Sequence, residues 1–522
     1  MNTTEFLEIT SAICPDRAAI IFEGKKYSFA ELNERATKLA DALSKLGVQK
    51  GDRISILQVN CNQYVEAYFA TARLGGIFVP LNFRAKQNEL THMLNNAEAS
   101  VLFVGERYVD LVNSMRPNLP TVKHYICIEG KAEGMLSYEE LLASGSSEPK
   151  ASAQIDDDDA TALMYTAGTT GLPKGVPQTH NSYSFYVLQN VNPPDPEVSE
   201  SNLITMPLYH VAGMQAMLAG IYGGRTIALM KQFETKEWLE TAQREKVTRV
   251  MLVPTMLKRI VDDPDFDKYD LSNIRVITYG AAACPYEVLK KTIERFPGRA
   301  LINAFGGTET SSTIAMLRAE DQIITGKETE EEKERKLKRL ATSIGLPLDD
   351  VEVQIRDEEG RALPTGEIGE LIVRGPRIMK GYWKDEEKTK KAFTADGWYR
   401  TGDMGYLDQE GYIYLSGRAD DLIVRGGENI SPEEVENVLY THPKIEEAAV
   451  IGVPDPEWGA EPGAIVVLKK GETATPDEIM EYCRERLAGF KRPRSVVFVD
   501  ELPKTSTGKV LRRTLRDQYG KH

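Results

Sequence analysis

Helical and strand-like patterns of apolar residues alternate along the chain up to about residue 345. Ser28 and Glu31 form a predicted capping box that opens an amphipathic helix ending at Gly47. The apolar stripe of this helix consists of Leu32, Ala36, Leu39, Leu43 and Leu46. The alternation continues with a helical segment at 65–74 and strand-like segments at 53–59, 76–80, 247–253 and 274–279. This pattern predicts α/β layering, in which parallel sheets are covered by helices.

The pattern changes after about residue 345. Short alternating strands at 351–356 and 370–374, joined by turn-rich segments, and a hairpin at 406–415 predict a β-rich region. We therefore expect a large N-terminal domain over residues 1–417, made of two α/β-layered subdomains and a β-rich subdomain.

The remaining segment, 418–522, has the size of a small domain, roughly a hundred residues. Its helix begins with its own signal, a Ser431 cap followed by Pro432 at the first helical position. We expect a small, mobile α+β C-terminal domain here. The fold class predicted for the whole chain is α/β.

Composition narrows the possible functions. The chain has 522 residues, too many for one hydrophobic core, and 41% apolar and 27% charged residues, as in a globular protein. We expect neither a membrane span nor a secretory signal, because no apolar run approaches about 20 residues and the first residues lack a basic region and an apolar core. Five scattered cysteines without a Cys-x-x-Cys pair indicate reduced thiols and a cytoplasmic protein.

The charge pattern bears on partners. A formal net charge of −14 without a long basic run argues against a nucleic-acid partner, so polyphosphates would need local lysines and backbone dipoles. Six unclustered histidines argue against a metal hydrolase. The charged runs 156–159 and 328–339 are interpreted as solvated surface, the second also as a candidate lid.

Residues 165–176, Tyr-Thr-Ala-Gly-Thr-Thr-Gly-Leu-Pro-Lys-Gly-Val, carry the most specific chemistry. Three glycines, three threonines and Lys174 follow a buried strand, so backbone amides, hydroxyls and one cation can converge on a phosphate group. The Walker pattern is absent, because Pro173 intervenes and no Ser or Thr follows the lysine. A flexible polar surface loop is the alternative for such a composition.

Five further motifs stand in a fixed order beside this loop. They are Pro-Leu-Tyr-His-Val-Ala-Gly at 207–213, Asn-Ala-Phe-Gly-Gly-Thr-Glu-Thr at 303–310, Trp-Tyr-Arg-Thr-Gly-Asp at 398–403, the stretch 417–436, and Pro-Lys-Thr-Ser-Thr-Gly-Lys at 503–509. With these motifs the chain resembles the adenylate-forming superfamily nearly end to end. That superfamily comprises acyl- and aryl-CoA synthetases, beetle luciferases and the adenylation domains of nonribosomal peptide synthetases.

The resemblance implies a reaction and three small-molecule ligands besides the acid: ATP, Mg²⁺ and coenzyme A. A carboxylate would attack the α-phosphorus of ATP, pyrophosphate would leave, and the thiol of coenzyme A would then displace AMP from the acyl-adenylate. Positioning and charge neutralisation dominate such phosphoryl chemistry.

The resemblance also implies roles for individual residues on the nucleotide. The loop residues would hold the β- and γ-phosphates: Thr166, Ala167, Gly168, Thr169, Thr170, Gly171 and Lys174. Glu309 would ligate Mg²⁺, assisted by Thr166, and Thr308 would donate to the α-phosphate. The adenine would lie among Gly280, Ala281, Ala282, Asn303, Ala304, Phe305 and Gly306, with Phe305 stacked on the ring.

The remaining implied roles concern the ribose and the second half-reaction. Asp403 would accept from the ribose hydroxyls, and Arg418 would reach the ribose or a phosphate, unless it forms an interdomain salt bridge. Lys509 would bridge the substrate carboxylate and the α-phosphate during adenylation only. A rotation about the hinge Asp420 would then remove it and bring Gly426 and Gly427 to the pantetheine tunnel.

On the acyl side, His210 would gate the tunnel or contact the carboxylate, although a lone histidine is more often structural. The glycines at 213, 306 and 307 suggest room for an extended aliphatic or aromatic acid.

Four functions fit these patterns. The preferred one is a carboxylate–CoA ligase acting on a medium- or long-chain fatty acid or an aryl acid. The others are a stand-alone enzyme that loads a carrier-protein thiol, a nucleotide-binding regulator without turnover, and a luciferase-like oxygenase. The intact Lys509, Glu309 and Asp403 argue against the regulator. An oligomer is possible, but the sequence does not indicate one.

Overall fold

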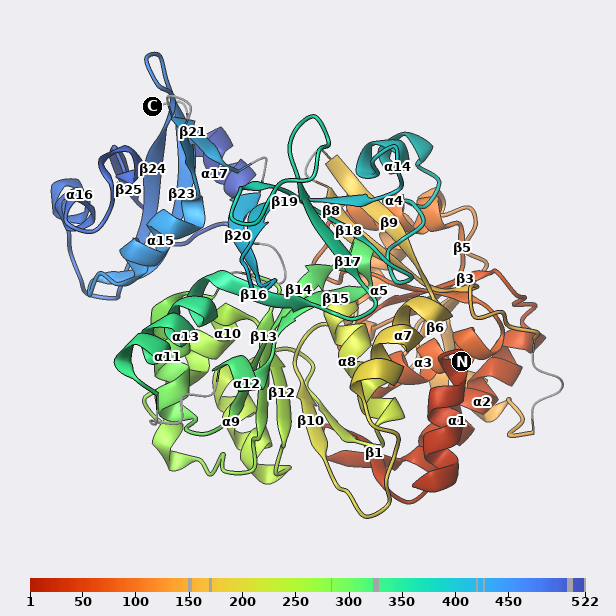
Figure 1. The fold of residues 1–522 in the computed structure, drawn as a ribbon. Helices are drawn as coiled ribbons and strands as arrows, with labels where there is room; N and C mark the ends of the chain where they lie inside the picture. The colour runs from red at the N-terminus through yellow and green to blue at the C-terminus, as the bar shows by residue number, and fades with distance from the viewer. Residues whose placement is uncertain are drawn as a thin grey trace.

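The computed structural model describes residues 1–148, 153–168, 171–282, 284–322, 328–418, 421–425, 428–504 and 510–520. Within these residues the strands form three sheets, and helices flank them (Figure 1). Two sheets belong to the large N-terminal part, and the third forms a small C-terminal body, coloured blue in Figure 1. The predicted α/β fold with several sheets and a small C-terminal domain is confirmed.

The largest sheet combines a parallel half with an antiparallel half. Its parallel strands run from β14 to β1, and the β16–β20 region pairs antiparallel. In spatial order the strands are β17 (Glu352–Arg356), β18 (Gly369–Arg374), β19 (Tyr399–Leu407), β20 (Ile413–Arg418), β16 (Ser343–Pro347), β15 (Ser312–Leu317), β14 (Ala300–Gly307), β13 (Val276–Gly280), β12 (Arg249–Leu252), β10 (Ser201–Ile204), β11 (Thr226–Leu229), β1 (Ala18–Phe22) and β2 (Lys25–Ser28). The β-rich region expected after residue 345 is therefore an antiparallel extension of an α/β sheet.

The second sheet is parallel except at one edge, where β8 and β9 form an antiparallel hairpin. Its order is β7 (Leu136–Ser137), β6 (His124–Cys127), β5 (Ala99–Val104), β3 (Arg53–Leu57), β4 (Ile77–Pro80), β8 (Ala160–Gly168) and β9 (Gly171–Thr179). This edge hairpin contains the glycine-rich loop.

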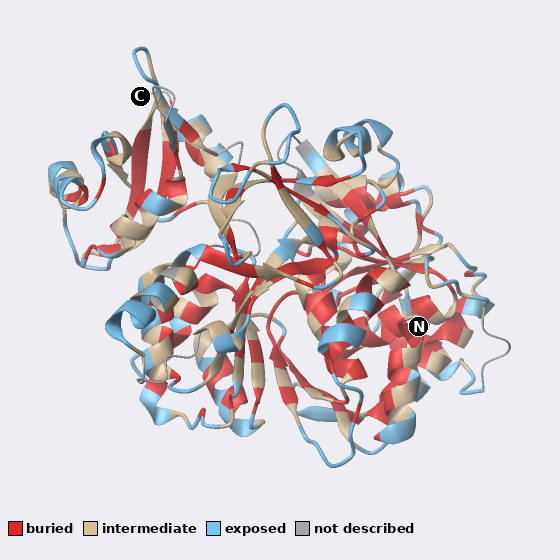
Figure 2. Cartoon of the chain, viewed as in Figure 1, coloured by how far each residue is buried: buried red, intermediate tan, exposed pale blue. Residues whose placement is uncertain are grey.

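The helices of the N-terminal part flank these sheets (Figure 1). They are α1 (Thr4–Ile13), α2 (Phe29–Lys45), α3 (Asn62–Arg73), α4 (Gln87–Ala97), α5 (Val109–Met115), α6 (Tyr138–Ala143), α7 (His180–Asn190), α8 (Val211–Tyr222), α9 (Thr235–Arg244), α10 (Pro254–Val261), α11 (Tyr286–Arg295), α12 (Ala319–Gln322), α13 (Glu330–Thr342) and α14 (Glu386–Ala392). Two of these helices, α3 and α8, are buried along most of their length. Buried residues follow the strands and the inner helix faces, and exposed residues the outer faces (Figure 2).

The C-terminal body is a five-stranded sheet with three helices. Its strands are β22 (Glu428–Ile430), β21 (Ile423–Arg425), β24 (Gly459–Leu468), β23 (Ile445–Asp455) and β25 (Ser495–Phe498), and its helices are α15 (Pro432–Tyr440), α16 (Pro476–Arg484) and α17 (Arg512–Tyr519). The large sheet ends with β20 at Arg418 and this sheet begins with β21 at Ile423. The division into domains 1–417 and 418–522 stays a prediction.

Most local predictions are confirmed. Helix α2 has the expected capping box, in which Glu31 N–H donates to Ser28 Oγ at 3.1 Å and Ser28 N–H donates to the Glu31 carboxylate at 2.7 Å. The interpretation of 156–159 as solvated surface is only partly right. Asp157 pairs with the N-terminal amine at 2.7 Å, and Asp159 pairs with Lys50 at 2.6 Å, so this run also anchors the chain.

The five cysteines are free, as expected, and all five are buried. In the described part of the chain, no helix has both the length and the apolar content to cross a membrane.

A buried polar cluster fixes the N-terminus against the second sheet. His180 Nδ1 accepts from the Thr3 N–H at 3.2 Å and lies 2.8 Å from Thr3 Oγ1, which is 2.7 Å from the Tyr68 hydroxyl. Because a backbone amide can only donate, Nδ1 must be unprotonated. Burial lowers the pKa of His180 to about 4, so this histidine is uncharged in the folded protein at neutral pH.

This histidine predicts a pH dependence of stability. Its folded pKa lies below the unfolded value of about 6.5, so the stability it gives is complete above pH 6.5 and declines as the pH falls toward 4. The destabilisation caused by His180→Asn, which keeps an acceptor for Thr3, should therefore shrink by about 2 kcal/mol between pH 7 and pH 5. Thermal unfolding of both proteins at the two pH values measures it. A pH-independent difference would contradict this account.

Candidate active site

The glycine-rich loop closes the β8–β9 hairpin at the edge of the second sheet. Thr166 of β8 stands opposite Lys174 of β9, and Gly168 stands opposite Gly171. Thr169 and Thr170 lie outside the described residues, as do the side chains of Ala167, Gly168 and Gly171. Thr166 Oγ1 is buried and has no hydrogen-bond partner among the described residues. A buried hydroxyl without a partner is costly, which marks a place where a ligand can supply one.

The turn that carries Glu309 follows β14 of the large sheet. Gly307 N–H donates to Thr310 Oγ1 at 2.9 Å, and the next two residues, Ser311 and Ser312, have left-handed φ angles of 51° and 83°. Such angles are unfavourable for residues other than glycine and persist only where neighbours hold them.

A buried ion pair packs against the turn that carries Glu309. The fully buried Arg377 pairs with Asp350, with 2.9 Å between Arg377 Nη2 and Asp350 Oδ1. Arg377 also donates to the Thr313 carbonyl at 2.7 Å, and its own carbonyl accepts from Ser311 Oγ at 2.8 Å. These contacts of Arg377 fix the end of the turn at Ser311 and Thr313.

One short segment, residues 379–383, joins the Glu309 turn to the glycine-rich hairpin. The N–H of Met379 donates to the Glu309 carbonyl at 2.8 Å, and the N–H of Trp383 donates to the Gly175 carbonyl at 2.8 Å. A direct bond adds to these, because Gln178 Nε2 of β9 donates to the Thr308 carbonyl at 2.8 Å. Two loops about 140 residues apart in sequence are thus held by backbone hydrogen bonds.

Tyr382 lies inside this segment and contacts both functional loops. Its hydroxyl donates to Glu309 Oε1 at 3.1 Å, and Lys174 Nζ lies 4.5 Å from its ring centroid. Burial and the Glu309 carboxylate raise the pKa of Tyr382, so the hydroxyl stays protonated and donates. Sequence reasoning missed this residue. The available signal was a pair of adjacent aromatic residues, Tyr382 and Trp383, in a turn-rich segment.

Asp403 and Arg418 are brought together as cross-strand neighbours of β19 and β20. Arg418 Nη1 lies 3.2 Å from Asp403 Oδ1. Tyr399, on the same strand as Asp403, extends the group toward Tyr382: burial and then the Glu309 carboxylate raise its pKa. Glu309, Tyr382, Tyr399, Arg418 and Asp403 therefore form one connected polar group. The observed partner of Arg418 is therefore Asp403, the residue predicted to bind the ribose, on the neighbouring strand of the same sheet.

The predicted adenine site lies where β13 and β14 end side by side. Gly280 stands opposite Ala304, and a Cβ at Gly280 would lie 2.2 Å from the Ala304 carbonyl oxygen, so glycine is required for strand packing. The following residue, Ala281, has a left-handed φ of 66°. Phe305 is partly buried beside the core cluster of the antiparallel strands, and Asn303 Nδ2 donates to the Ser343 carbonyl at 3.3 Å.

Two of the glycines expected to leave space for the acyl group, Gly213 and Gly306, instead face the protein's own backbone. A Cβ at Gly213 would lie 2.4 Å from the Pro207 carbonyl oxygen, and one at Gly306 would lie 1.7 Å from the Ser312 carbonyl oxygen. These glycines permit close backbone approach, so the interpretation as acyl-pocket space is wrong for both. At Gly307 the nearest atom to a Cβ is Glu309 Oε2, at 3.6 Å.

His210 precedes α8, as the N-terminal cap residue. Its ring is half-buried beside Tyr209, with 4.3 Å between the ring centroids, and Tyr209 in turn packs on Phe83. Desolvation, with the positive charge of Arg84 as a second cause, lowers the pKa of His210 to about 3. At neutral pH the imidazole is therefore uncharged.

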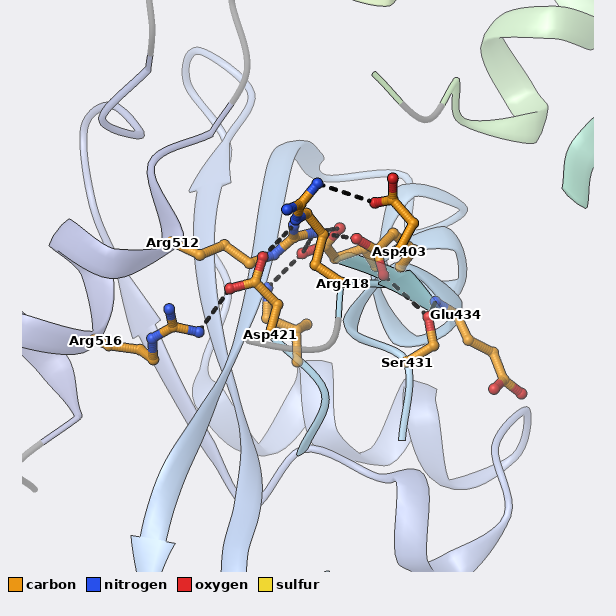
Figure 3. Close-up of polar contacts among 10 residues, drawn as sticks. Asp403, Arg418, Asp421, Ser431, Glu434, Arg512 and Arg516 are labelled. Atoms are coloured by element: carbon orange, nitrogen blue, oxygen red, sulfur yellow. Dashed lines mark hydrogen bonds and ion pairs between the residues drawn. The ribbon is translucent and has the colours of Figure 1, made fainter. Parts of the chain in front are cut away.

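Lys509, Asp420, Gly426 and Gly427 lie outside the described residues. Their flanks are nevertheless tied together by ion pairs (Figure 3). Asp421 accepts from Arg516 at 2.7 Å and lies 3.7 Å from Arg512. Arg512 also pairs with Glu433 and Glu436, at 3.0 and 2.8 Å. Helix α17, which follows the Lys509 loop, is thus attached to the start of the C-terminal body.

The residues present suit a nucleotide with a divalent cation. Glu309 offers a carboxylate and Thr166 a buried, unsatisfied hydroxyl, which are hard oxygen donors of the kind Mg²⁺ prefers. Among the described residues, the one carboxylate assigned to the metal is that of Glu309, as is usual where phosphates complete the coordination of Mg²⁺.

Comparison with known proteins identifies the chain. Residues 7–383 match the model of the AMP-binding enzyme family, and residues 434–509 match the AMP-binding enzyme C-terminal domain. The chain belongs to the AMP-binding enzyme family. It is an enzyme of the AMP-forming acid–CoA ligase type, so ATP is one of its substrates.

Named relatives and a solved structure cover nearly the whole chain. A feruloyl-CoA synthase from Amycolatopsis sp is 35% identical over 510 residues, 97% of this chain and 96% of that protein. A long-chain-fatty-acid–CoA ligase from Bacillus subtilis (strain 168) is 35% identical over 542 residues, 98% of this chain and 93% of that protein. The crystal structure of the anthranilate CoA ligase AuaEII with anthranoyl-AMP has a TM-score of 0.89 and 29% identity, covering 99% of this chain and 97% of that one.

The bond from Tyr382 to Glu309 predicts a binding defect. If Glu309 ligates the metal, Tyr382→Phe frees its carboxylate to rotate, and binding of Mn²⁺ with a non-hydrolysable ATP analogue should weaken about three- to tenfold. Electron paramagnetic resonance of free Mn²⁺ measures this without turnover. Tyr406→Phe, on the same strand as Tyr399, is the control and should bind as the wild type does. Equal binding by all three proteins would show that Tyr382 does not position the carboxylate.

Proposed function

We propose that this enzyme joins a medium- or long-chain fatty acid or an aryl acid to coenzyme A at the expense of ATP. The observation that carries the proposal is the fixed placement of the Glu309 carboxylate beside the glycine-rich hairpin, through Tyr382 and the 379–383 segment. Relatives at the same level of identity act on acids of both kinds, which supports the substrate class at this breadth.

In the first half-reaction the hairpin receives the β- and γ-phosphates. Backbone amides of the loop and the Lys174 ammonium oppose their negative charge, and Thr308 donates to the α-phosphate. Glu309 and Thr166 would hold Mg²⁺, which would supply positive charge to the phosphate oxygens. A substrate carboxylate oxygen bonds to the α-phosphorus while the bond from that phosphorus to the bridging oxygen breaks, and pyrophosphate leaves.

Asp403 and Phe305 hold the nucleoside. Asp403 already faces Arg418 at 3.2 Å, so the ribose hydroxyls share the carboxylate with that guanidinium. A carboxylate binds a hydroxyl about twice as strongly as a neutral acceptor does. Phe305 stacks on adenine, and Gly280, Ala281 and Ala282 line the opposite face.

Lys509 stabilises the charge that develops between the carboxylate and the α-phosphate. In the second half-reaction the C-terminal body turns at Asp420, and the thiolate of coenzyme A attacks the acyl carbon. The bond between that carbon and the phosphate oxygen breaks, so AMP leaves and a thioester forms. The ion pairs of Arg512 and Arg516 make α17, and with it the Lys509 loop, turn with the start of this body.

His210 contributes a neutral ring at the acyl side. Its low pKa keeps it uncharged at neutral pH, so it lines the pocket without attracting a second carboxylate. This favours acids with one carboxylate and an apolar body.

A panel of acids tests the function. Fatty acids of increasing chain length and substituted benzoic and cinnamic acids are supplied with ATP and Mg²⁺, and pyrophosphate release is followed with and without coenzyme A. We expect release with acids of one of these classes and equal amounts of AMP and thioester when coenzyme A is present. Thioester formed only on a carrier protein would replace the coenzyme A assignment, and no release with any acid would refute the ligase function.

The role of Lys509 predicts a split between the half-reactions. Lys509→Ala should lower adenylation by at least about a hundredfold, the size seen when a transition-state donor is removed. Thioester formation from supplied acyl-adenylate should stay near the wild-type rate. Lys470→Ala, an exposed lysine of the same body, is the control and should change neither rate. Equal loss in both half-reactions would refute the assigned role.

A further inference from the structure

A cavity of about 290 Å³ lies between the glycine-rich hairpin, helix α4 and the 382–388 segment, and Tyr382 of the Glu309 group lines it. Helix α4 forms one wall with His92 and Asn96, the start of β9 forms another with Lys174, and residues 382–388 close it. The indole N–H of Trp383 donates to the Asn96 carbonyl at 3.1 Å, so the first and third walls are joined. The proposed reaction uses Lys174 and Tyr382 of this lining, but it assigns nothing to Lys384 or Lys388.

Cations dominate its lining. Lys174, Lys384 and Lys388 line it from two different elements, against one carboxylate, Asp385. His92 Nε2 lies 3.1 Å from the Pro173 carbonyl, which can only accept, so this nitrogen carries a proton and fixes the hairpin to α4. The protein as a whole carries a net charge of −14. Three lysines around one small cavity therefore make a local region of positive charge on an acidic protein.

The lysines are available to a ligand. Lys174 makes neither a hydrogen bond nor an ion pair with the described residues, and lies over the Tyr382 ring instead. Lys384 pairs with Glu98 at 2.7 Å with 43% of its side chain exposed, and Lys388 pairs with Asp385 with 45% exposed. Exposed pairs of this kind contribute about 0–1 kcal/mol, so an anion of higher charge displaces them easily.

Lys174 connects this cavity with the reaction. It lines the cavity, yet it stands on the hairpin opposite Thr166, where the proposed function places the phosphates of ATP. An anion that leaves the hairpin on this side would first contact Lys174, which the two sites share, and then Lys384 and Lys388.

We propose that this cavity is a second anion site that binds inorganic pyrophosphate outside the ATP site, with Lys384 and Lys388 as its own ligands. The proposal rests on the proposed function for the origin of the pyrophosphate, although binding itself needs no turnover. Three lysines arranged around one cavity favour a polyanion over a single phosphate group. The site would keep the leaving group away from the newly formed adenylate and delay its return.

Direct binding tests the site. The wild-type enzyme is first saturated with a non-hydrolysable ATP analogue, so that the ATP site is filled, and is then titrated with inorganic pyrophosphate by calorimetry. We expect pyrophosphate to bind to this complex, and Lys384→Gln/Lys388→Gln to weaken that binding at least fivefold. The matched control is Lys390→Gln/Lys391→Gln, the same charge change at two exposed lysines of α14. The control should bind as tightly as the wild type.

The outcomes separate the alternatives. Loss of pyrophosphate binding once the ATP site is filled, or equal weakening in both double variants, would overturn the proposal. Binding of inorganic phosphate as tight as that of pyrophosphate would also overturn it, because the site would then be a general anion site. Thermal unfolding of each variant shows whether it is folded. Pyrophosphate binding that persists while no acid is adenylated would refute the proposed function and leave the second site standing.

Discussion

Two backbone hydrogen bonds decide where the chemistry of this enzyme can occur. The glycine-rich hairpin belongs to one sheet and the Glu309 turn to another, so the packing of either sheet alone does not set their separation. The segment 379–383 donates one amide to each loop, at Glu309 and at Gly175. Backbone bonds are insensitive to side-chain changes, so this link holds a phosphate-binding loop and a carboxylate in register.

The charges of the site follow from this link. Tyr382, in the middle of the segment, donates to Glu309 and presents its ring to Lys174. One aromatic side chain therefore contacts both an anion and a cation without neutralising either. Burial keeps the Tyr382 and Tyr399 hydroxyls protonated, because it raises the pKa of each. An acidic protein can in this way bind an acidic ligand, since positive charge and donors are concentrated locally.

Structural features that depend on residues close together in the sequence could be predicted from the sequence. The Ser28–Glu31 capping box, the strand before the glycine-rich loop, and the hairpin expected at 406–415 all follow from local patterns and are found in the structure. Contacts between distant segments were beyond that reasoning. The bond from Tyr382 to Glu309 spans 73 residues, and no spacing rule indicates it.

The roles of the glycines in the motifs also could not be predicted from the sequence. A glycine in a motif can face a ligand or the protein's own backbone, and the sequence does not distinguish them. At Gly213 and Gly306 the neighbouring carbonyl oxygens settle the question in favour of packing. The roles assigned to Lys509, Asp420, Gly426 and Gly427 depend on family motifs alone and stay predictions.

The most direct test of the central claim is a crystal structure with ATP and Mn²⁺, in which anomalous scattering locates the metal. The account predicts the metal about 2.0–2.3 Å from a Glu309 carboxylate oxygen, with the β- and γ-phosphates against the Thr166–Lys174 hairpin. A metal bound away from Glu309, or phosphates seated away from that hairpin, would contradict it.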